Sequence, residues 1–257
     1  MLLCLDIGNS HIFGGVFDHN TILLRFRLSS CLMTADELGM LLKTVLRDNA
    51  YNPDLLQAIA ICSVVPQLKY VLHQACEQYF AITPYYLCSD MHMDLYIQYD
   101  MPQELGIDRI ANSIAAIQLY PNQPLIVIDY GTAMTFNVIN AEQQYLGGAI
   151  MPGMRLMRDA LSNHTAQLPW VDLVSPSIVV GKNTVANIQS GIFYSMVGAA
   201  KEMLQQITRE VFVNVTPTIL ATGGFAHLFA QQAIYDYLLP DLILHGIYFA
   251  WQINRSD

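Results

Sequence analysis

The chain is poor in charge and lacks the residue patterns of secreted proteins. Only 13% of its 257 residues are charged, and acidic residues outnumber basic ones, which gives a formal net charge of −9 at pH 7. A nucleic-acid partner would require a basic face, so none is expected. The five cysteines form no Cys-x-x-Cys pair and their number is odd, which argues against a disulfide framework or a cysteine metal site.

Long apolar runs are also absent. No stretch reaches the ~18 consecutive apolar residues of a membrane span, and the first residues lack the basic region of a signal peptide. Together with free thiols, this predicts a cytoplasmic protein without a membrane partner. Hydrophobic residues nevertheless make up 53% of the chain. So much apolar material with so little charge predicts an oligomer that covers part of its surface.

One motif is present twice. Residues 2–8 and 125–131 each have the pattern of an apolar strand that ends in Asp-x-Gly, and a small polar residue follows each. Gly8 and Gly131 permit tight turns whose backbone N–H groups form a concave anion site. Asp6, at the end of the first strand, can hold a hydrated Mg²⁺ ion. Two such hairpins facing each other would clamp the phosphates of one nucleotide.

The distribution of apolar residues predicts an α/β protein, because runs typical of strands alternate with helical periodicity. In the first half we expect strands at 2–7, 11–17, 22–28, 58–65 and 85–87, and helices at 38–46, 68–80 and 108–119. In the second half we expect strands at 125–130, 133–139 and 218–221, and helices at 154–161, 185–204, 226–237 and 245–251. The repeated hairpin divides the chain into two related halves, residues 1–119 and 120–257.

Several polar positions have both a structural and a functional interpretation. Asp108 could cap a helix N-terminus, or it could be an ionised base at the positive helix end, which phosphoryl transfer tolerates. Arg109 could be a surface charge or could bind a carboxylate substrate. Thr184 could cap the long helix of the second half or contact a substrate. The Thr-Gly-Gly sequence at 222–224 could be a tight connection or a place where the backbone approaches an adenine or a ribose.

Taken together, these residues resemble the type III pantothenate kinases, which belong to the superfamily of acetate and sugar kinases, Hsp70 and actin. Any one motif is common, but the ordered set extends nearly from end to end of the chain. The matching motifs are Asp6-Ile7-Gly8-Asn9-Ser10, Ser63-Val64-Val65-Pro66, Tyr99 with Gly106-Ile107-Asp108-Arg109, Asp129-Tyr130-Gly131-Thr132-Ala133, Gly147-Gly148-Ala149-Ile150-Met151-Pro152-Gly153, Gly181-Lys182-Asn183-Thr184, Thr222-Gly223-Gly224 and Leu242-Ile243-Leu244-His245-Gly246-Ile247. Ser10 stands where relatives usually carry Thr, and the hydroxyl group is kept.

The resemblance implies two duplicated ribonuclease H-like (actin-like ATPase) halves, each a mixed sheet flanked by helices. It implies a phosphotransferase with an alcohol group as acceptor, which moves the γ-phosphoryl group of ATP to the 4′-hydroxyl of pantothenate. This reaction is the first step of coenzyme A biosynthesis. Asp108 would be the general base that accepts the hydroxyl proton.

The resemblance also implies that ATP and its Mg²⁺ ion lie between the two loops. Asp6 would lie at the Mg²⁺–phosphate centre, directly or through water, and Thr132 would touch ATP. The residues around the phosphates would be Asp6, Ile7, Gly8, Asn9, Ser10, His11, Ile12 and Phe13. Asp129 matches the ligand of a monovalent cation, potassium or ammonium.

The pantothenate pocket implied by the resemblance is lined by Tyr99, Gly106, Ile107, Asp108 and Arg109, and Thr184 would contact pantothenate across a homodimer interface. Three alternatives are another small-molecule kinase such as a sugar kinase, a nucleotide-driven switch or chaperone, and an accessory protein that binds nucleotide without catalysis. The chain is too short for the partner-binding domain of a switch, and the presence of Asp108 favours an enzyme. We therefore expect the pantothenate kinase.

Overall fold

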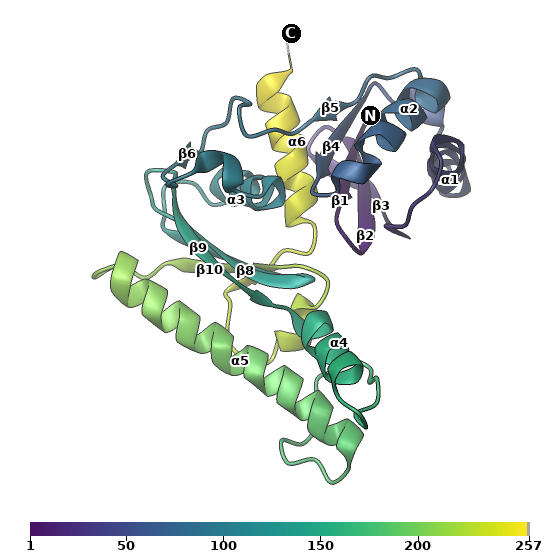
Figure 1. Cartoon of the computed structure of the whole chain (residues 1–257). Coiled ribbons are helices and arrows are strands. Elements are labelled where there is room, and N and C mark those ends of the chain that lie inside the picture. The colour runs from purple at the N-terminus through teal and green to yellow at the C-terminus, as the bar shows by residue number, and fades with distance from the viewer. Residues whose placement is uncertain (256–257) are drawn as a thin grey trace. The chain divides into compact units, whose positions relative to one another are not determined.

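The computed structural model describes residues 1–255 of the chain (Figure 1). The chain forms two compact units. The first contains residues 1–95, 99–119 and 242–255, and the second contains Tyr96–Gln98 and Tyr120–Asp241. Each unit has one mixed β-sheet.

The first unit is a five-stranded sheet in the order β3-β2-β1-β4-β5. Its strands are β1 (Leu2–Ile7), β2 (His11–Asp18), β3 (Thr21–Ser29), β4 (Ala58–Ser63) and β5 (Tyr85–Tyr86). β1, β2 and β3 form an antiparallel meander, whereas β1, β4 and β5 are parallel. Its helices are α1 (Ala35–Asp48), α2 (Lys69–Phe80), α3 (Ile107–Leu119) and α6 (Leu242–Asn254), with short 3₁₀ helices η1 (Pro53–Leu55), η2 (Pro66–Leu68) and η3 (Pro102–Glu104).

Side-chain alternation along β1 assigns a different pair of helices to each face of this sheet. Leu3, Leu5 and Ile7 are buried in one cluster with apolar residues of α1 and α2, and Figure 1 shows these two helices side by side. The intervening residues of β1, including Asp6, therefore face the opposite side, where α3 and α6 pack on β1 and β4. The Phe17 ring of β2 stacks on Tyr248 of α6 with 4.7 Å between ring centroids.

The second unit repeats the strand order of the first. Its six-stranded sheet has the order β11-β10-β7-β8-β9-β6, in which β7, β8, β9, β10 and β11 correspond in turn to β1 to β5. The elements are β6 (Tyr96–Ile97), β7 (Leu125–Tyr130), β8 (Ala133–Ile139), β9 (Gln144–Pro152), β10 (Thr218–Thr222), β11 (Tyr237–Leu238), α4 (Met154–His164), α5 (Thr184–Val211) and η4 (Ala226–Phe229).

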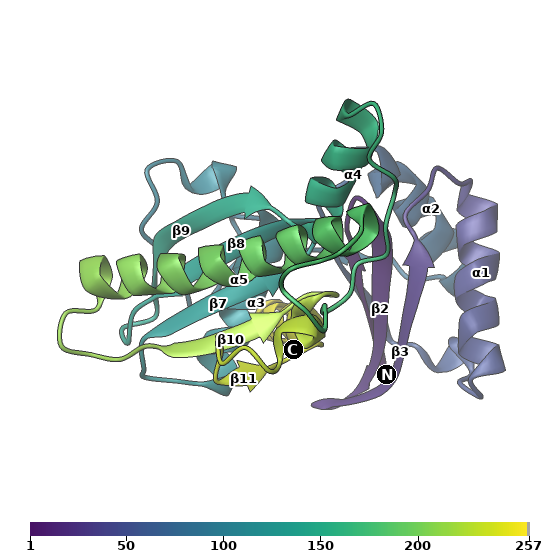
Figure 2. The same ribbon diagram turned by 90° about the horizontal axis from the view of Figure 1, so that it is seen from below.

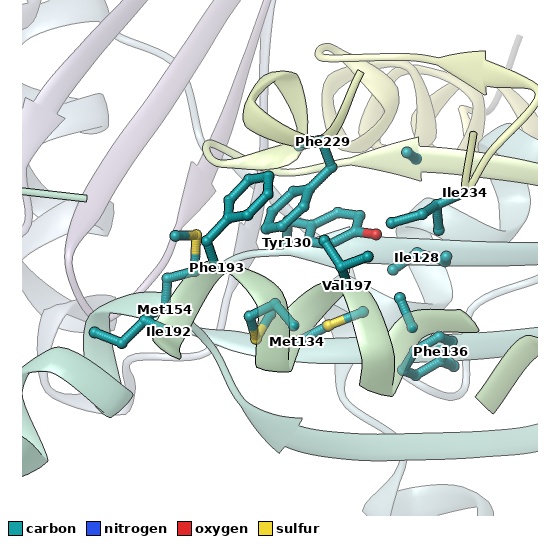
Figure 3. Close-up of a cluster of buried hydrophobic side chains, with 14 of the residues drawn as sticks. Ile128, Tyr130, Met134, Phe136, Met154, Ile192, Phe193, Val197, Phe229 and Ile234 are labelled. Atoms are coloured by element: carbon teal, nitrogen blue, oxygen red, sulfur yellow. The ribbon is translucent and has the colours of Figure 1, made fainter. Parts of the chain in front are cut away.

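The long helix α5 lies across this sheet (Figure 2). An apolar cluster joins the two, in which Tyr130 of β7 and Phe193 of α5 both stack on Phe229, at centroid separations of 4.6 and 5.0 Å (Figure 3). These side chains point away from the face that carries Asp129, because successive residues of a strand alternate between the two faces. The packed aromatic cluster thus supports the strand that ends in the second Asp-x-Gly motif.

Most expected elements are present within a few residues of their predicted bounds, but the helix expected at 226–237 was wrong. This segment forms η4 and then the edge strand β11. The Asp236 backbone N–H donates to the Ile219 carbonyl (2.9 Å), and the Ile219 N–H donates to the Asp236 carboxylate (2.8 Å). Pairing with β10 thereby overrides the local helical pattern, as tertiary contacts often do.

The final helix also differs from expectation. It belongs to the first unit, although the sequence pattern places residues 120–257 together in the second half. The reason is close packing at Gly246, where an added Cβ would lie 2.5 Å from the carbonyl carbon of Ala111 in α3. Among the described residues, no helix is both long and apolar enough to cross a membrane.

Candidate functional site

The first Asp-x-Gly motif forms a tight hairpin between β1 and β2. The Gly8 N–H donates to the His11 carbonyl (3.0 Å), and the Ser10 carbonyl accepts from the Ser30 N–H (3.1 Å) at the end of β3. Asp6 is half-buried and Asn9, at the tip, is exposed. The hairpin predicted from the sequence is therefore present, with a carboxylate at its base and polar groups at its tip.

Not every residue of this segment can contact a ligand through its side chain. Ile7 and Ile12 are 0% and 1% exposed and belong to the core formed with α1 and α2. Phe13 is 6% exposed and lies beneath the guanidinium of Arg27, 4.0 Å from it. Ile7 and Ile12 therefore offer a nucleotide only their backbone groups, whereas the hairpin tip also offers side chains.

Asp108 lies in the first turn of α3, two residues after Gly106. Its Oδ1 atom accepts a hydrogen bond from the Arg109 N–H (2.9 Å), so the carboxylate lies at the positive end of the helix. An added Cβ on Gly106 would lie 2.6 Å from this same oxygen. The glycine thus leaves the space in which the carboxylate sits.

Arg109 is 7% exposed, which excludes the interpretation of this residue as a surface charge. Arg109 interacts with other groups of the chain, as a buried arginine must because removing a charge from water is costly. Ile107 and Gly106 are half-buried beside it, and Tyr99 is half-buried in the same unit. A buried guanidinium next to Asp108 is suited to a ligand that carries a carboxylate.

Asp6 and Asp108 both lie near Cys62. The sequence alone indicates only that Cys62 is a buried thiol. It lies on β4 directly opposite Asp6 on β1, so both side chains share the sheet face that α3 and α6 cover. Burial raises the pKa of the Cys62 thiol well above its ordinary value, and the negative charges of Asp6 and Asp108 raise it further. Both carboxylates are therefore close enough to act on one sulfur atom. The strand pairing that shows this is not readable from the sequence.

The second motif ends β7 in the second unit. The Gly131 N–H donates to the Ala133 carbonyl (3.1 Å), so this motif also forms a hairpin, with a loop one residue shorter than that of the first. Gly153, before α4, supports it from one side: its N–H donates to the Thr132 carbonyl (3.1 Å), and an added Cβ would lie 2.5 Å from the Thr132 oxygen. Thr132 and Asp129 are half-buried.

Gly223, directly after β10, supports the second motif. It has a φ of +93°, and an added Cβ would collide with Asp129 Oδ1 and lie 2.6 Å from the backbone nitrogen of Tyr130. The Phe225 N–H also donates to the Tyr130 carbonyl (3.2 Å). The Thr-Gly-Gly turn and the second Asp-x-Gly motif, which are far apart in the sequence, are therefore in direct contact.

Thr184 is not the cap of the long helix. The cap is Asn183, whose side chain accepts from the Ala186 N–H (2.9 Å), and Thr184 is the exposed first residue of α5. This excludes the capping interpretation and leaves the threonine hydroxyl at the surface of the second unit.

The carboxylate oxygens at the two motifs suit hard cations that take most of their ligands from phosphate and water. No group of three or more His, Cys, Asp or Glu side chains that could hold a metal occurs among residues 1–255. Mg²⁺ that arrives with a nucleotide needs only one or two carboxylates beside phosphate and water, and Asp6 can supply one. At Asp129, Gly223 packs so closely that an added Cβ would collide with the carboxylate oxygen, and such an oxygen is a ligand that hard cations prefer.

Comparison with known proteins relates the chain to one family. A family model described as type III pantothenate kinase matches residues 2–206. The type III pantothenate kinase of Legionella pneumophila (strain Corby) is 53% identical over 256 residues, which cover 100% of both chains.

Solved structures show the same fold at much lower identity. A conserved protein of Campylobacter jejuni, assigned to the Baf family of transcriptional activators, has a TM-score of 0.59 and 21% identity and covers 98% of both chains. A Porphyromonas gingivalis protein, assigned as an N-acetylglucosamine kinase, has a TM-score of 0.52 and 10% identity and covers 99% of both chains. The fold is that of the actin-like kinases, with two duplicated ribonuclease H-like halves.

Proposed function

The chain belongs to the type III pantothenate kinase family, and from this premise we propose how its residues carry out the family's reaction. The chain is an enzyme, a phosphotransferase that uses ATP to phosphorylate pantothenate for coenzyme A biosynthesis. The acceptor is the 4′-hydroxyl group and the product is 4′-phosphopantothenate, as the motifs imply.

The observation that carries the residue assignment is the common position of Asp6 and Asp108. Asp6 is paired with Cys62 across β1 and β4, and α3, which presents Asp108 in its first turn, packs on β4. One carboxylate thus faces the nucleotide phosphates while the other, near the same thiol, faces the acceptor. This is the arrangement that in-line transfer between ATP and an alcohol requires.

In the proposed step the 4′-oxygen attacks the γ-phosphorus while the bond from that phosphorus to the β,γ-bridging oxygen breaks, and ADP leaves. Asp108 orients the hydroxyl and accepts its proton late in the transfer. A weak carboxylate base is sufficient because positioning and charge neutralisation dominate this chemistry. Mg²⁺ bound with ATP, held by Asp6 directly or through water, supplies further neutralisation of phosphate charge.

The second motif has two proposed roles. Thr132 contacts ATP, and Asp129 supplies a carboxylate oxygen to a monovalent cation, potassium or ammonium. The support for the second role is the close packing of Gly223 against Asp129 Oδ1, which fixes the position of this oxygen at the end of β7. The turn at 222–224 is then available for the adenosine moiety, because it contacts the same strand end.

The proposed pantothenate site consists of Tyr99, Gly106, Ile107, Asp108 and Arg109. The buried Arg109 guanidinium is suited to bind the pantothenate carboxylate with two parallel hydrogen bonds. In that pose Asp108, its neighbour in the sequence, faces the other end of the acceptor.

We further propose a homodimer in which Thr184 contacts pantothenate near the interface. Thr184 is exposed, and Val179, Val180 and Val185 around it are 59%, 80% and 43% exposed. A cluster of large exposed apolar residues is typical of a protein interface. Val180→Asp should therefore dissociate the dimer in sedimentation experiments and reduce activity.

Free thiols at all five cysteines support a cytoplasmic location, and the net charge of −9 is against a nucleic-acid partner.

The experiment that tests the function combines purified protein, Mg²⁺-ATP, pantothenate and potassium, and follows phosphopantothenate by mass spectrometry. We expect product only when ATP, Mg²⁺ and pantothenate are all present, and stimulation by potassium. Sugars in place of pantothenate are the matched control and should give no phosphorylated product.

Two outcomes would contradict the proposal. Phosphorylation of a sugar but not of pantothenate would make the chain another small-molecule kinase of the same superfamily. Nucleotide binding without any product would favour a non-catalytic accessory protein.

A further inference from the structure

A row of side chains crosses the first sheet at the level of Asp6. Asp6 pairs with Phe13 across β1 and β2, and Phe13 pairs with Arg27 across β2 and β3. On the other side Asp6 pairs with Cys62 of β4. Residues directly opposite each other in a sheet project from the same face. Arg27 therefore lies on the face of Asp6, two strands away, or roughly 10 Å at the usual strand spacing.

The Phe13 ring fixes the direction of the Arg27 side chain. The guanidinium carbon lies 4.0 Å from the ring centroid, within the range of a favourable cation–π contact. Arg27 is exposed, and among the described residues of the first unit no carboxylate lies within ion-pair distance of its guanidinium. Its hydrogen-bond donors are thus available to a ligand, on the side of the sheet where Asp6 lies.

The strand that carries Arg27 is joined to the first hairpin. Ser29 pairs with His11, and the Ser30 N–H donates to the Ser10 carbonyl (3.1 Å). Arg27 therefore holds a fixed position two residues before the contact with the hairpin. A ligand bound by the Gly8–Ser10 backbone would have this guanidinium on its flank.

The electrostatics of the site favour a further cation beside the first hairpin. The hairpin segment 6–13 contains no Lys or Arg, and Asp6 and Asp108 both contribute negative charge close to Cys62. A polyphosphate brought beside two carboxylates is repelled unless positive charge is present. A single Mg²⁺ ion cannot neutralise both the carboxylates and the phosphates of ATP.

We propose that Arg27 binds the polyphosphate of ATP at the first hairpin, with the Phe13 ring as the platform that orients its guanidinium. The inference rests on the proposed function in that ATP is the phosphoryl donor. It assigns Arg27 a direct contact with the substrate, in addition to the residues of the Asp-x-Gly motifs.

A purely structural role would be to cover Phe13, and substitutions separate the two roles. Arg27→Met keeps an unbranched apolar side chain over the ring but removes the charge, whereas Arg27→Lys keeps a charge without the planar fork. Arg25→Met is the matched control, because Arg25 lies on the same strand and face but is paired with Gly15, one step farther from the hairpin.

The experiment measures binding of ATP and of adenosine by calorimetry, together with the KM values for ATP and pantothenate. Arg27→Met should weaken ATP binding at least about tenfold, the size expected for the loss of a charge-assisted hydrogen bond. Arg27→Lys should lie between this variant and the wild type. Adenosine binding, the KM for pantothenate and the thermal midpoint should stay unchanged, and Arg25→Met should bind ATP like the wild type.

The outcomes distinguish this inference from the proposed function. If the wild type binds ATP and Arg27→Met binds it equally well, Arg27 only covers Phe13 and the inference is wrong. If adenosine binding falls as much as ATP binding, the variant has disturbed the site as a whole and the phosphate contact is also refuted. If the wild type binds no ATP, the proposed donor itself is wrong.

Discussion

Asp108 is the single residue on which the proposed proton transfer depends. Asp108→Asn keeps the size of the side chain and its hydrogen bond from the Arg109 N–H, but it removes the proton acceptor. Turnover should fall by roughly 10²–10⁴, the usual contribution of a positioned base, while the affinity for ATP is retained. Steady-state kinetics and nucleotide titration check this. Glu104→Gln, an exposed carboxylate in η3, is the control and should be fully active; near-normal turnover of Asp108→Asn would remove Asp108 from the mechanism.

A substitution at Gly223 tests the proposed role of Asp129 in binding a cation. Gly223→Ala places a Cβ against Asp129 Oδ1 at a φ of +93°, so the carboxylate must move and the backbone is strained by ~1–3 kcal/mol. We expect a lower thermal midpoint and a higher potassium concentration for half-maximal activation. Gly224→Ala is the matched control, because nothing lies within 4 Å of its added Cβ. An unchanged potassium response in a destabilised Gly223→Ala protein would contradict the cation role but not the packing.

Among single residues, the sequence predicts the positions of those whose role follows from a local pattern. Asp6 and Asp129 end apolar strands and precede glycines, and both are found at hairpin bases. The roles of Cys62 and Arg27 could not be predicted, because each depends on which residue lies opposite on a neighbouring strand. Burial of Arg109 was also not predictable, since it depends on elements that pack around α3 from distant parts of the chain.

The packing of α6 on α3 is the element contact that supports the catalytic helix. An added Cβ on Gly246 would collide with the carbonyl oxygen of Ala111, so Gly246→Ala should push the helices apart. Overpacking of this kind costs ~1–3 kcal/mol, and turnover should fall with stability because α3 carries Asp108. Chemical denaturation and kinetics of the same samples check this.

The control for this prediction is another helical glycine. Gly198 of α5 is exposed and has nothing within 4 Å of an added Cβ, so Gly198→Ala should raise stability by ~0.5–1 kcal/mol through helix propensity. If Gly246→Ala were equally stabilising, the close contact between α3 and α6 would not exist in solution.

Elements with a strong local pattern were predictable, and elements formed by distant pairing were not. The apolar run 58–65 and the helix at 108–119 were found nearly as expected. The segment 226–237 was not, because its strand forms only by pairing with β10. The two-residue strand β6 had no detectable pattern, since a bridge of that length has no periodicity.

For the whole molecule, the duplication visible in the two Asp-x-Gly motifs is confirmed by the strand order. β3-β2-β1-β4-β5 and β9-β8-β7-β10-β11 are the same arrangement. The assignment of the last helix to a unit was not predictable, because it depends on the complementarity of Gly246 and Ala111 rather than on position in the chain.

The stability of the molecule should fall in alkaline solution because it buries thiols. Burial raises the pKa of Cys4 and Cys62 well above the ordinary value of 9.0, and that of Cys76 to about 12. Below pH 9 these thiols are protonated in both the folded and the unfolded chain, so their contribution is complete. Between pH 9 and about 12 the unfolded chain releases protons that the folded chain retains, so the free energy of unfolding decreases as pH rises.

Each buried thiol should contribute a slope of roughly 1.4 kcal/mol per pH unit in that range. Urea denaturation at several values between pH 8 and pH 10.5 measures it. Cys76→Ala removes one titrating group from the core, so its stability should fall less steeply than that of the wild type, even though its absolute stability is lower from the cavity. Cys31→Ala changes an exposed cysteine and should keep the wild-type slope. Equal slopes for wild type and Cys76→Ala would show that this thiol is not held protonated by the fold.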